Sequence, residues 1–212
     1  MKTILHLCAD IGSDSKPWAD NGYNVIKIGK DIGVENYTPP QGVYGVIANP
    51  VCLEFTTART GGKSRDLEAG MFLVRHCQRI IDQCNPTFWV IENPARGDLK
   101  KFLGEPRYKY QPWWFGSPWT KHTALWGEFN IPERIFHKWE DVPKNEKLYV
   151  RKRGNRSGNK PPMYQFHKSA IEHIPEFHCF RELVKDDMSM RSLCSQGFAN
   201  AFYEANKIKQ KE

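Results

Sequence analysis

The feature that most constrains the fold is a short, nearly continuous apolar run at residues 87–92, Thr-Phe-Trp-Val-Ile-Glu. Such a run is typical of a strand in a parallel sheet, where helices cover both faces and neither face meets water. Three further β-rich runs precede it, at residues 3–8, 23–28 and 43–48. Since parallel neighbours need crossover connections, this spacing predicts an α/β fold.

Helical periodicity is strongest at residues 64–84, where Ser64 or Asp66 can supply the N-terminal cap. Its apolar positions recur at steps of three and four residues: Leu67, Met71, Val74, Cys77, Ile80, Ile81 and Cys84. The remaining predicted elements are a helix from about residue 17, a short helix at 97–103, strands at 108–115 and 123–127, and a last helix at 197–209. Their alternation predicts an open sheet with helices on both faces.

The length and the cysteine pattern bound the class of protein. A chain of 212 residues predicts a single domain over residues 1–212. No window offers the roughly 20 apolar residues of a membrane span, and the apolar start reaches Asp10 too soon for a signal peptide. The six cysteines form no CxxC pair, which predicts free thiols in a reducing, cytoplasmic compartment.

A metal site is not expected. His173, His178 and Cys179 lie close together in the sequence. A zinc site would need a fourth ligand and a better spacing. We therefore expect an exposed polar turn around Pro175 and no bound metal.

Positive charge is concentrated at residues 144–162. Seven Lys and Arg residues stand there against the single acid Glu146, in a chain whose formal net charge is +7. Gly, Pro, Asn and Ser are frequent between them, which predicts a basic mobile loop within the domain. Its candidates for contact with nucleic-acid or nucleotide phosphates are Arg151, Lys152 and Arg153. A solvated surface loop is the alternative.

Two short segments, Asn49-Pro50-Val51-Cys52 and Glu92-Asn93-Pro94, stand at the ends of predicted strands. Cys52 follows the third β-rich run by a few residues, and Glu92 ends the fourth. Ligands of doubly wound sheets bind outside the carboxyl ends of the strands. A thiolate is a good nucleophile once a positive charge or a helix start lowers its pKa, and a carboxyl group beside it can donate or accept a proton. Cys52 and Glu92 are therefore candidate catalytic residues; an inert thiol and an ordinary turn are the alternative.

These two segments and two later ones resemble the DNA cytosine-5 methyltransferases. Asn49-Pro50-Val51-Cys52 resembles their Pro-Cys nucleophile loop, and Glu92-Asn93-Pro94 is similar to their Glu-Asn motif. Phe115-Gly116-Ser117-Pro118, followed by Lys121 and Thr123, resembles the Tyr-Gly-x-Pro segment of small phage-type members, and residues 192–206 resemble the closing helix. The resemblance implies a Rossmann-like methyltransferase sheet in a bacterial or phage-infected cell.

The resemblance also implies a mechanism. The thiolate of Cys52 would add to C6 of a pyrimidine, Glu92 would hydrogen-bond at N3, and C5 would then take a methyl group from S-adenosylmethionine. A base inside a duplex would first have to be flipped out. The residues that would bind the substrate are Asn49, Pro50, Asn93, Pro94, Lys121 and Thr123, together with Arg151, Lys152 and Arg153.

The cofactor segments depart from the family pattern. His6 stands where many members carry an acid, and only Gly12, with Ser13 beside it, keeps the flexible turn. The acid expected near Gly29 to hold the ribose is absent, so Asp31 or Glu35 could replace it only if the loop folds back. The candidate cofactor-binding residues are His6, Asp10, Gly12, Ser13, Asp31 and Phe198.

The chain is short for a protein that reads a DNA sequence. Only about 65 residues separate Trp126 from Ser192, where larger members carry a recognition domain. We therefore expect a single-stranded DNA or free pyrimidine nucleotide as substrate, or a partner protein that supplies recognition. The alternatives are a nucleic-acid-binding pseudoenzyme with a drifted cofactor pocket and a pyrimidine C5 transferase that uses another one-carbon donor.

Overall fold

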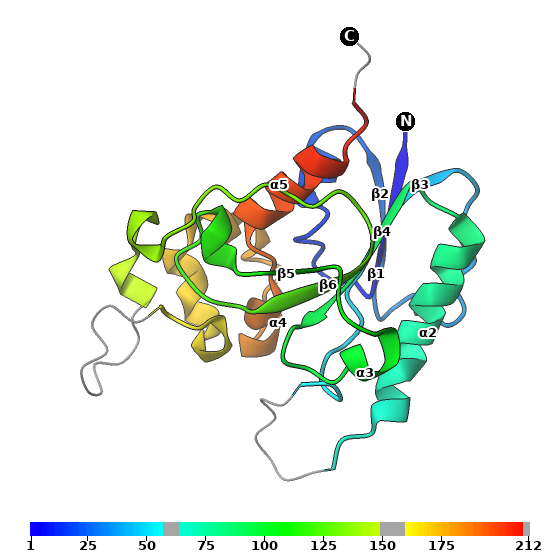
Figure 1. The fold of residues 1–212 in the computed structure, drawn as a ribbon, viewed down its shortest axis with the longest axis horizontal. Coiled ribbons are helices and arrows are strands. Elements are labelled where there is room, and N and C mark those ends of the chain that lie inside the picture. The colour runs from blue at the N-terminus through cyan, green and yellow to red at the C-terminus, as the bar shows by residue number, and fades with distance from the viewer. Residues whose placement is uncertain (57–63, 149–159, 210–212) are drawn as a thin grey trace.

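The computed structural model of the chain describes residues 1–56, 64–148 and 160–209 (Figure 1). Its centre is a six-stranded sheet in the order β2-β1-β3-β4-β6-β5. The strands are β1 (Thr3–Leu7), β2 (Asn24–Ile28), β3 (Val43–Ala48), β4 (Phe88–Pro94), β5 (Tyr108–Tyr110) and β6 (Thr123–Glu128). The first four are parallel, and β6 lies antiparallel between β4 and β5. The predicted α/β open sheet is confirmed.

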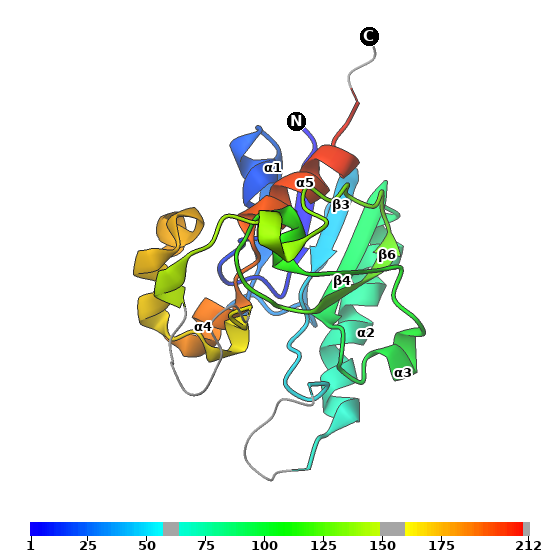
Figure 2. The ribbon, with the colours of Figure 1, turned by 60° about the vertical axis from the view of Figure 1, so that its left-hand side comes forward.

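One face of the sheet is covered by α2 (Leu67–Cys84) (Figures 1 and 2). Asp66 caps this helix, since its side chain accepts a hydrogen bond from the backbone N–H of Ala69. The apolar stripe of α2 packs on the strand residues that point to this face, among them Leu5 and Ile91. Burial of this stripe provides most of the stability that holds the helix in place.

The opposite face is covered by α1 (Lys16–Asp20) and α5 (Gln196–Asn206), which lie side by side in Figure 2. Their side chains pack on the alternate strand residues, with Trp18 of α1 stacked on Phe88 of β4. Both faces are therefore buried, as the continuous apolar pattern of β4 predicts.

A third apolar cluster, yellow to orange in Figure 2, packs residues 160–193 beside the sheet around the buried Trp119. Its short elements are η4 (Met163–Gln165), η5 (Lys168–His173), η6 (Pro175–Phe180) and α4 (Asp187–Ser192); η1 (Pro112–Phe115), η2 (Trp139–Asp141), η3 (Glu146–Leu148) and α3 (Lys100–Leu103) complete the fold. Among the described residues, no helix is long and apolar enough to cross a membrane.

Glu176 of η6 joins this cluster to the sheet. Its Oε1 accepts a hydrogen bond of 2.9 Å from Ser117 Oγ. Burial raises the pKa of this carboxyl group to about 7, against the hydrogen bonds from Ser117 and from the backbone at Gln196 and Gly197. The folded chain thus retains a proton that the unfolded chain releases near pH 4.5.

The free energy of unfolding is therefore expected to fall as the pH rises through this window, by about 3 kcal/mol between pH 4.5 and pH 8. Glu176→Gln should flatten this slope, which denaturant unfolding at several pH values measures. Glu172→Gln is the matched control, because that exposed carboxylate pairs with Arg181 on the surface. Equal slopes in both variants would contradict the assignment.

The structure corrects three predicted elements. The strand predicted at residues 87–92 does not end at Glu92 but continues to Pro94, because β6 runs alongside and pairs with Glu92, Asn93 and Pro94. The predicted strand at 108–115 ends at Tyr110, since Pro112 removes a backbone donor and begins η1. The last helix ends at Asn206 and not at residue 209.

Candidate active site

Three polar side chains share one face of the sheet at its carboxyl edge. Side chains alternate along a strand, so His6 follows Ile4 and Glu92 follows Val90 on the face that α5 covers. Asn49 comes directly after β3 and continues the same row. The order of the strands reverses between β1 and β3, and such a switch point opens a crevice at the carboxyl ends. The fold thus brings these residues together where a ligand is expected.

A hydrogen bond joins the first two segments that the resemblance rests on. The side-chain amide of Asn93, which is fully buried, donates to the carbonyl oxygen of Pro50 at 3.0 Å. This bond fixes the loop that carries Cys52 to the end of β4. Pro94 lies opposite Thr123 in the β4–β6 ladder. Asn93, Pro50 and Pro94 therefore support the backbone of the loop and of the strand end that carry Cys52 and Glu92.

Cys52 is half-buried beyond β3, and its carbonyl oxygen accepts hydrogen bonds from the backbone of Phe55 and Thr56. Burial raises the pKa of its thiol, and the charge of Glu92 raises it further, whereas the charge of Lys121 lowers it. The charges of Glu92 and Lys121 thus both act on the thiol of Cys52. The thiol is therefore protonated at neutral pH, and Lys121 is the group here that favours the thiolate.

Glu92 lies beside Asn49 and Asp14. Burial raises the pKa of its carboxyl group, and the charge of Asp14 also raises it, whereas Lys121 and the hydrogen bond from Asn49 lower it. A carboxyl group with a raised pKa can hold a proton for donation near neutral pH.

Lys121 and Thr123 are held by the backbone. The ammonium group of Lys121 donates to the carbonyl oxygens of Ser192 and Leu193, each at 3.1 Å. The hydroxyl group of Thr123 is buried and donates to the carbonyl oxygen of Lys121 at 2.9 Å. In this structure the side chain of Thr123, a candidate substrate contact, orders the turn that carries Lys121.

Three of the predicted cofactor residues are packed within the protein. His6 is 1% exposed and lies between Ser15 and Asn49. The hydroxyl group of Ser13 accepts from the backbone N–H of Cys194 at 3.0 Å. The ring of Phe198 stacks on Tyr110, with centroids 3.7 Å apart.

The other three lie around the turn after β1 and the loop after β2. Asp10 accepts a hydrogen bond of 2.9 Å from the backbone N–H of Lys30 and so fixes the turn after β2. Gly12 has a φ of +85°, and a Cβ there would lie 2.6 Å from a side-chain carbon of Lys27. Asp31 is exposed. Asp10 and Gly12 thus explain how the two strand ends stay together.

As packed, the region beside Phe198 does not leave room for S-adenosylmethionine. The space between Asp14, Glu92 and Phe198 is a cavity of about 20 Å³, which is enough for one water molecule. A cofactor needs a pocket of at least roughly 300 Å³. His6 has both ring nitrogens engaged within the protein.

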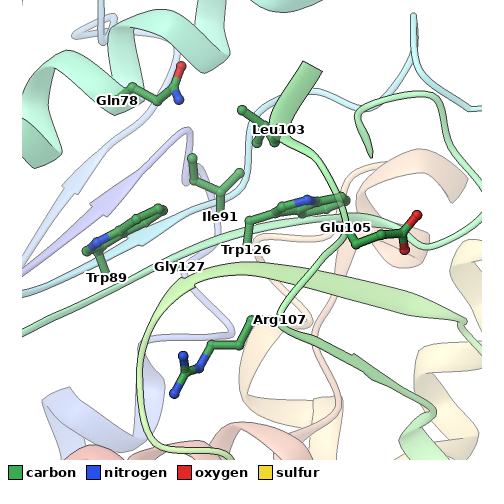
Figure 3. A pocket seen from close by; sticks show the side chains of 8 residues that line it. All are labelled: Gln78, Trp89, Ile91, Leu103, Glu105, Arg107, Trp126 and Gly127. Atoms are coloured by element: carbon green, nitrogen blue, oxygen red, sulfur yellow. The ribbon is translucent and has the colours of Figure 1, made fainter. Parts of the chain in front are cut away.

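A wider hollow of about 450 Å³ lies on the other face of the sheet (Figure 3). Its lining residues are Gln78, Trp89, Ile91, Leu103, Glu105, Arg107, Trp126 and Gly127. Ile91 precedes Glu92 in β4 and points to the face of α2, so the sheet separates this hollow from the carboxyl group of Glu92.

Arg151, Lys152 and Arg153, the predicted phosphate contacts, lie outside the described residues. The flanks of the basic segment pack on tryptophans. The ammonium group of Lys144 lies 4.4 Å from the ring centroid of Trp139, and that of Lys160 lies 4.3 Å from the centroid of Trp113.

The sequence analysis missed Asp14, whose carboxyl group accepts from the side-chain amide of Asn49. The sequence feature that indicates Asp14 as a site residue is its position in the turn after Gly12, at the carboxyl end of the first strand. It also missed Cys194 and Gln196, which bind Ser13 across a separation of more than 180 residues. Nothing local in the sequence indicates that pairing.

The chain was compared with known protein families, proteins and solved structures. No family model matches the chain. The chain is 30% identical over 151 residues to a protein of Frog virus 3 (isolate Goorha) named "Probable DNA (cytosine-5)-methyltransferase", and the match covers 61% of this chain and 66% of the viral protein. A solved E. coli structure titled "putative DNA modification methyltransferase encoded within prophage" is similar at 15% identity, with a TM-score of 0.39, over 59% of this chain and 45% of that chain. The viral relative confirms the resemblance that Cys52 and Glu92 predict: this chain is a homologue of a protein named as a DNA cytosine-5 methyltransferase.

Proposed function

We propose that this protein methylates C5 of cytosine in DNA, with Cys52 as the nucleophile and Glu92 as the acid. The observation that carries the proposal is the Asn93–Pro50 hydrogen bond, which joins the segment of Cys52 to the strand end that carries Glu92 at the switch point of the sheet; the charge of Glu92 also acts on the thiol of Cys52. Together with Lys121 they provide a nucleophile, a proton donor and a positive charge that act on one another.

Each residue type has a chemical task. Addition of the Cys52 thiolate to C6 forms a carbon–sulfur bond and moves an electron pair toward C5. A proton from Glu92 at N3 neutralises the charge that develops on the ring. C5 then accepts the methyl group; water takes the C5 proton, the C6–sulfur bond breaks so that Cys52 leaves as the thiolate, and the proton on N3 returns to Glu92, which restores the aromatic ring.

The thiolate forms by loss of a proton from Cys52, whose pKa burial and the charge of Glu92 hold above its ordinary value. Protonation of Glu92 removes one of these effects. We therefore propose that Glu92 is neutral when the thiolate attacks, with Lys121 stabilising the thiolate.

The methyl donor that the resemblance implies is S-adenosylmethionine. We propose this donor for the protein; three of the residues expected to hold it, His6, Ser13 and Phe198, are packed within the protein, and we derive no step through it. No metal is part of the proposal.

The substrate is proposed to be DNA, single stranded or opened by base flipping. Positive charge between residues 144 and 162 would bind phosphates without reading bases. A partner protein would then supply sequence recognition. The free thiols suit a cytoplasmic enzyme of a bacterial or phage-infected cell.

The packed cofactor residues favour a second candidate, a nucleic-acid-binding pseudoenzyme of the same fold. His6, Ser13 and Phe198 carry this alternative, because none of them is available to a cofactor. A pyrimidine C5 transferase with another one-carbon donor would keep Cys52 and Glu92 but would not bind S-adenosylmethionine.

The test is incubation of the protein with S-adenosylmethionine and single- or double-stranded DNA, followed by mass spectrometry of the nucleosides. We expect 5-methylcytosine with the wild type and none with Cys52→Ala. Calorimetric titration with S-adenosylmethionine separates the alternatives. Binding of DNA without binding of the donor and without methylation would refute the methyltransferase and leave the pseudoenzyme or a C5 transferase with another donor.

A further inference from the structure

A chain of side-chain hydrogen bonds leads from the turn after β1 to Glu92. Nδ1 of His6 lies 2.8 Å from Ser15 Oγ, and Nε2 lies 2.7 Å from Asn49 Oδ1. Nδ2 of Asn49 lies 3.3 Å from Glu92 Oε2 and 3.3 Å from Asp14 Oδ1. His6 and Ser15 are buried, so their polar atoms depend on these partners.

The direction of each bond follows from the two carboxyl groups. Both face Asn49 as acceptors, so its amide nitrogen donates to them and its amide oxygen is turned toward His6. That oxygen can only accept, and therefore Nε2 of His6 carries a proton.

The protonation state of the His6 ring decides the direction of its hydrogen bond with Ser15. Burial lowers the pKa of His6, an effect that Lys27 supports and that Asp14 and the bond to Asn49 oppose. In the neutral ring with a proton on Nε2, Nδ1 is an acceptor; the hydroxyl group of Ser15 lies 2.8 Å from it and 3.2 Å from the carbonyl oxygen of Gly12, and its one proton then turns to the nearer acceptor, Nδ1.

This series of hydrogen bonds also distinguishes the two carboxyl oxygens of Glu92. Since Oε2 faces the amide nitrogen of Asn49, it accepts in either state of the carboxyl group. The proton of a neutral Glu92 therefore lies on Oε1.

We propose that Asn49 and His6 are positioning residues for Glu92: His6, as the Nε2–H form, holds the amide of Asn49, and this amide holds Oε2 so that Oε1 presents its proton to N3 of the pyrimidine. The inference rests on the proposed function for its pyrimidine. It gives His6 a role at the carboxyl group of Glu92, in place of the cofactor contact expected for the end of β1.

The charges around Glu92 make the proposal measurable as a pH dependence. Asp14 faces it from the turn after β1 and Lys121 from the segment before β6. The groups of Cys52, Tyr110 and Cys194 lie within electrostatic reach of it. Asn49 favours the charged form of Glu92, so its removal should raise the pKa of that carboxyl group.

The first test is NMR spectroscopy of the full chain. With ¹⁵N-labelled histidine, the ring of His6, assigned by its absence in His6→Gln, should show a neutral ring protonated at Nε2. With ¹³C-labelled glutamate, the midpoint of Glu92, assigned by Glu92→Gln, should rise by about one pH unit in Asn49→Leu. A His6 ring protonated at Nδ1 alone, or an unchanged midpoint in Asn49→Leu, would overturn the proposal; the first readout needs only the wild-type fold.

The second test is the rate of covalent adduct formation on a single-stranded oligonucleotide containing 5-fluorocytosine, with S-adenosylmethionine, as a function of pH. His6→Leu should slow adduct formation about tenfold or more. It should also shift the pH at which the rate changes on the acidic side of the pH profile. His6→Gln should restore most of the rate, because its side-chain amide can donate from the place of Nε2. Equal losses in both variants without that shift in pH would indicate a merely structural role.

The two proposals fail in different ways. A wild type that forms no adduct, while Asn49→Leu still shifts the midpoint of Glu92, refutes the proposed reaction and supports the hydrogen-bond chain. Adduct formation with an unshifted midpoint supports the reaction and overturns the positioning role.

Discussion

Replacement of Cys52 by alanine is expected to abolish covalent trapping of the protein on DNA that contains 5-fluorocytosine. The wild type should form a stable adduct with S-adenosylmethionine present, because fluorine at C5 cannot leave as a proton does and the thioether at C6 is retained. Cys52→Ala lacks the attacking sulfur, so the rate should fall by more than about a thousandfold. Denaturing electrophoresis of the protein–DNA adduct measures the result.

Two controls make the result specific to Cys52. Cys179→Ala removes an exposed thiol of η6 and should trap as the wild type does. Glu92→Gln should also lose the adduct, yet Cys52 should react faster with iodoacetamide at neutral pH, because the charge that raises its pKa is gone. Trapping by Cys52→Ala at the wild-type rate would refute the assignment of the nucleophile.

The positions of the candidate pair, Cys52 and Glu92, at one edge of the sheet could be predicted because they follow from local patterns. The apolar runs fix the strands, and a parallel sheet brings the carboxyl ends of β3 and β4 to one edge, whatever the connections contain. Cys52 and Glu92 then lie at that edge without further information. The period of two along each strand even places Glu92 on the face of α5 with Val90, although only the structure shows which face α5 covers.

The cofactor side could not be predicted in the same way. Ser13, His6 and Phe198 are buried by contacts to distant parts of the chain, and the bond from Cys194 to Ser13 spans 181 residues. Motif positions gave these residues roles that their packing does not support.

In a similar way, the pairing of Glu92 with Leu125 depends on the antiparallel β6, which an apolar run alone does not reveal.

The segment from residue 139 to residue 180 was also beyond prediction. Its described helices are short 3-10 turns of three to six residues, which show no helical period in the sequence. Phe166, Phe177 and Trp119 hold them by burial in the third cluster. Stability there comes from tertiary packing and not from local propensity.

The second large effect is expected at Gly197, in the first turn of α5. A Cβ at this position would lie 2.0 Å from the carbonyl oxygen of Phe115, which is backbone and cannot rotate away. Gly197→Ala must therefore push α5 away from η1, which would disturb the stacking of Phe198 on Tyr110 and the tie from Cys194 to Ser13. We expect a loss of more than about 3 kcal/mol in the free energy of unfolding, at the upper end of overpacking costs, measured by denaturant unfolding.

Gly42→Ala separates steric overlap from backbone strain. Gly42 has a φ of +74° with nothing within 4 Å of an added Cβ, so this variant carries only the conformational cost, about 1 kcal/mol. Gly197 has no positive φ, so any larger loss in Gly197→Ala reports the contact between α5 and η1. A loss no greater than that of Gly42→Ala would show that α5 is free to move outward. The cavity beside Glu92 and Phe198 could then open toward the volume that a cofactor needs, and the packing that now excludes S-adenosylmethionine would be a closed state of the same site.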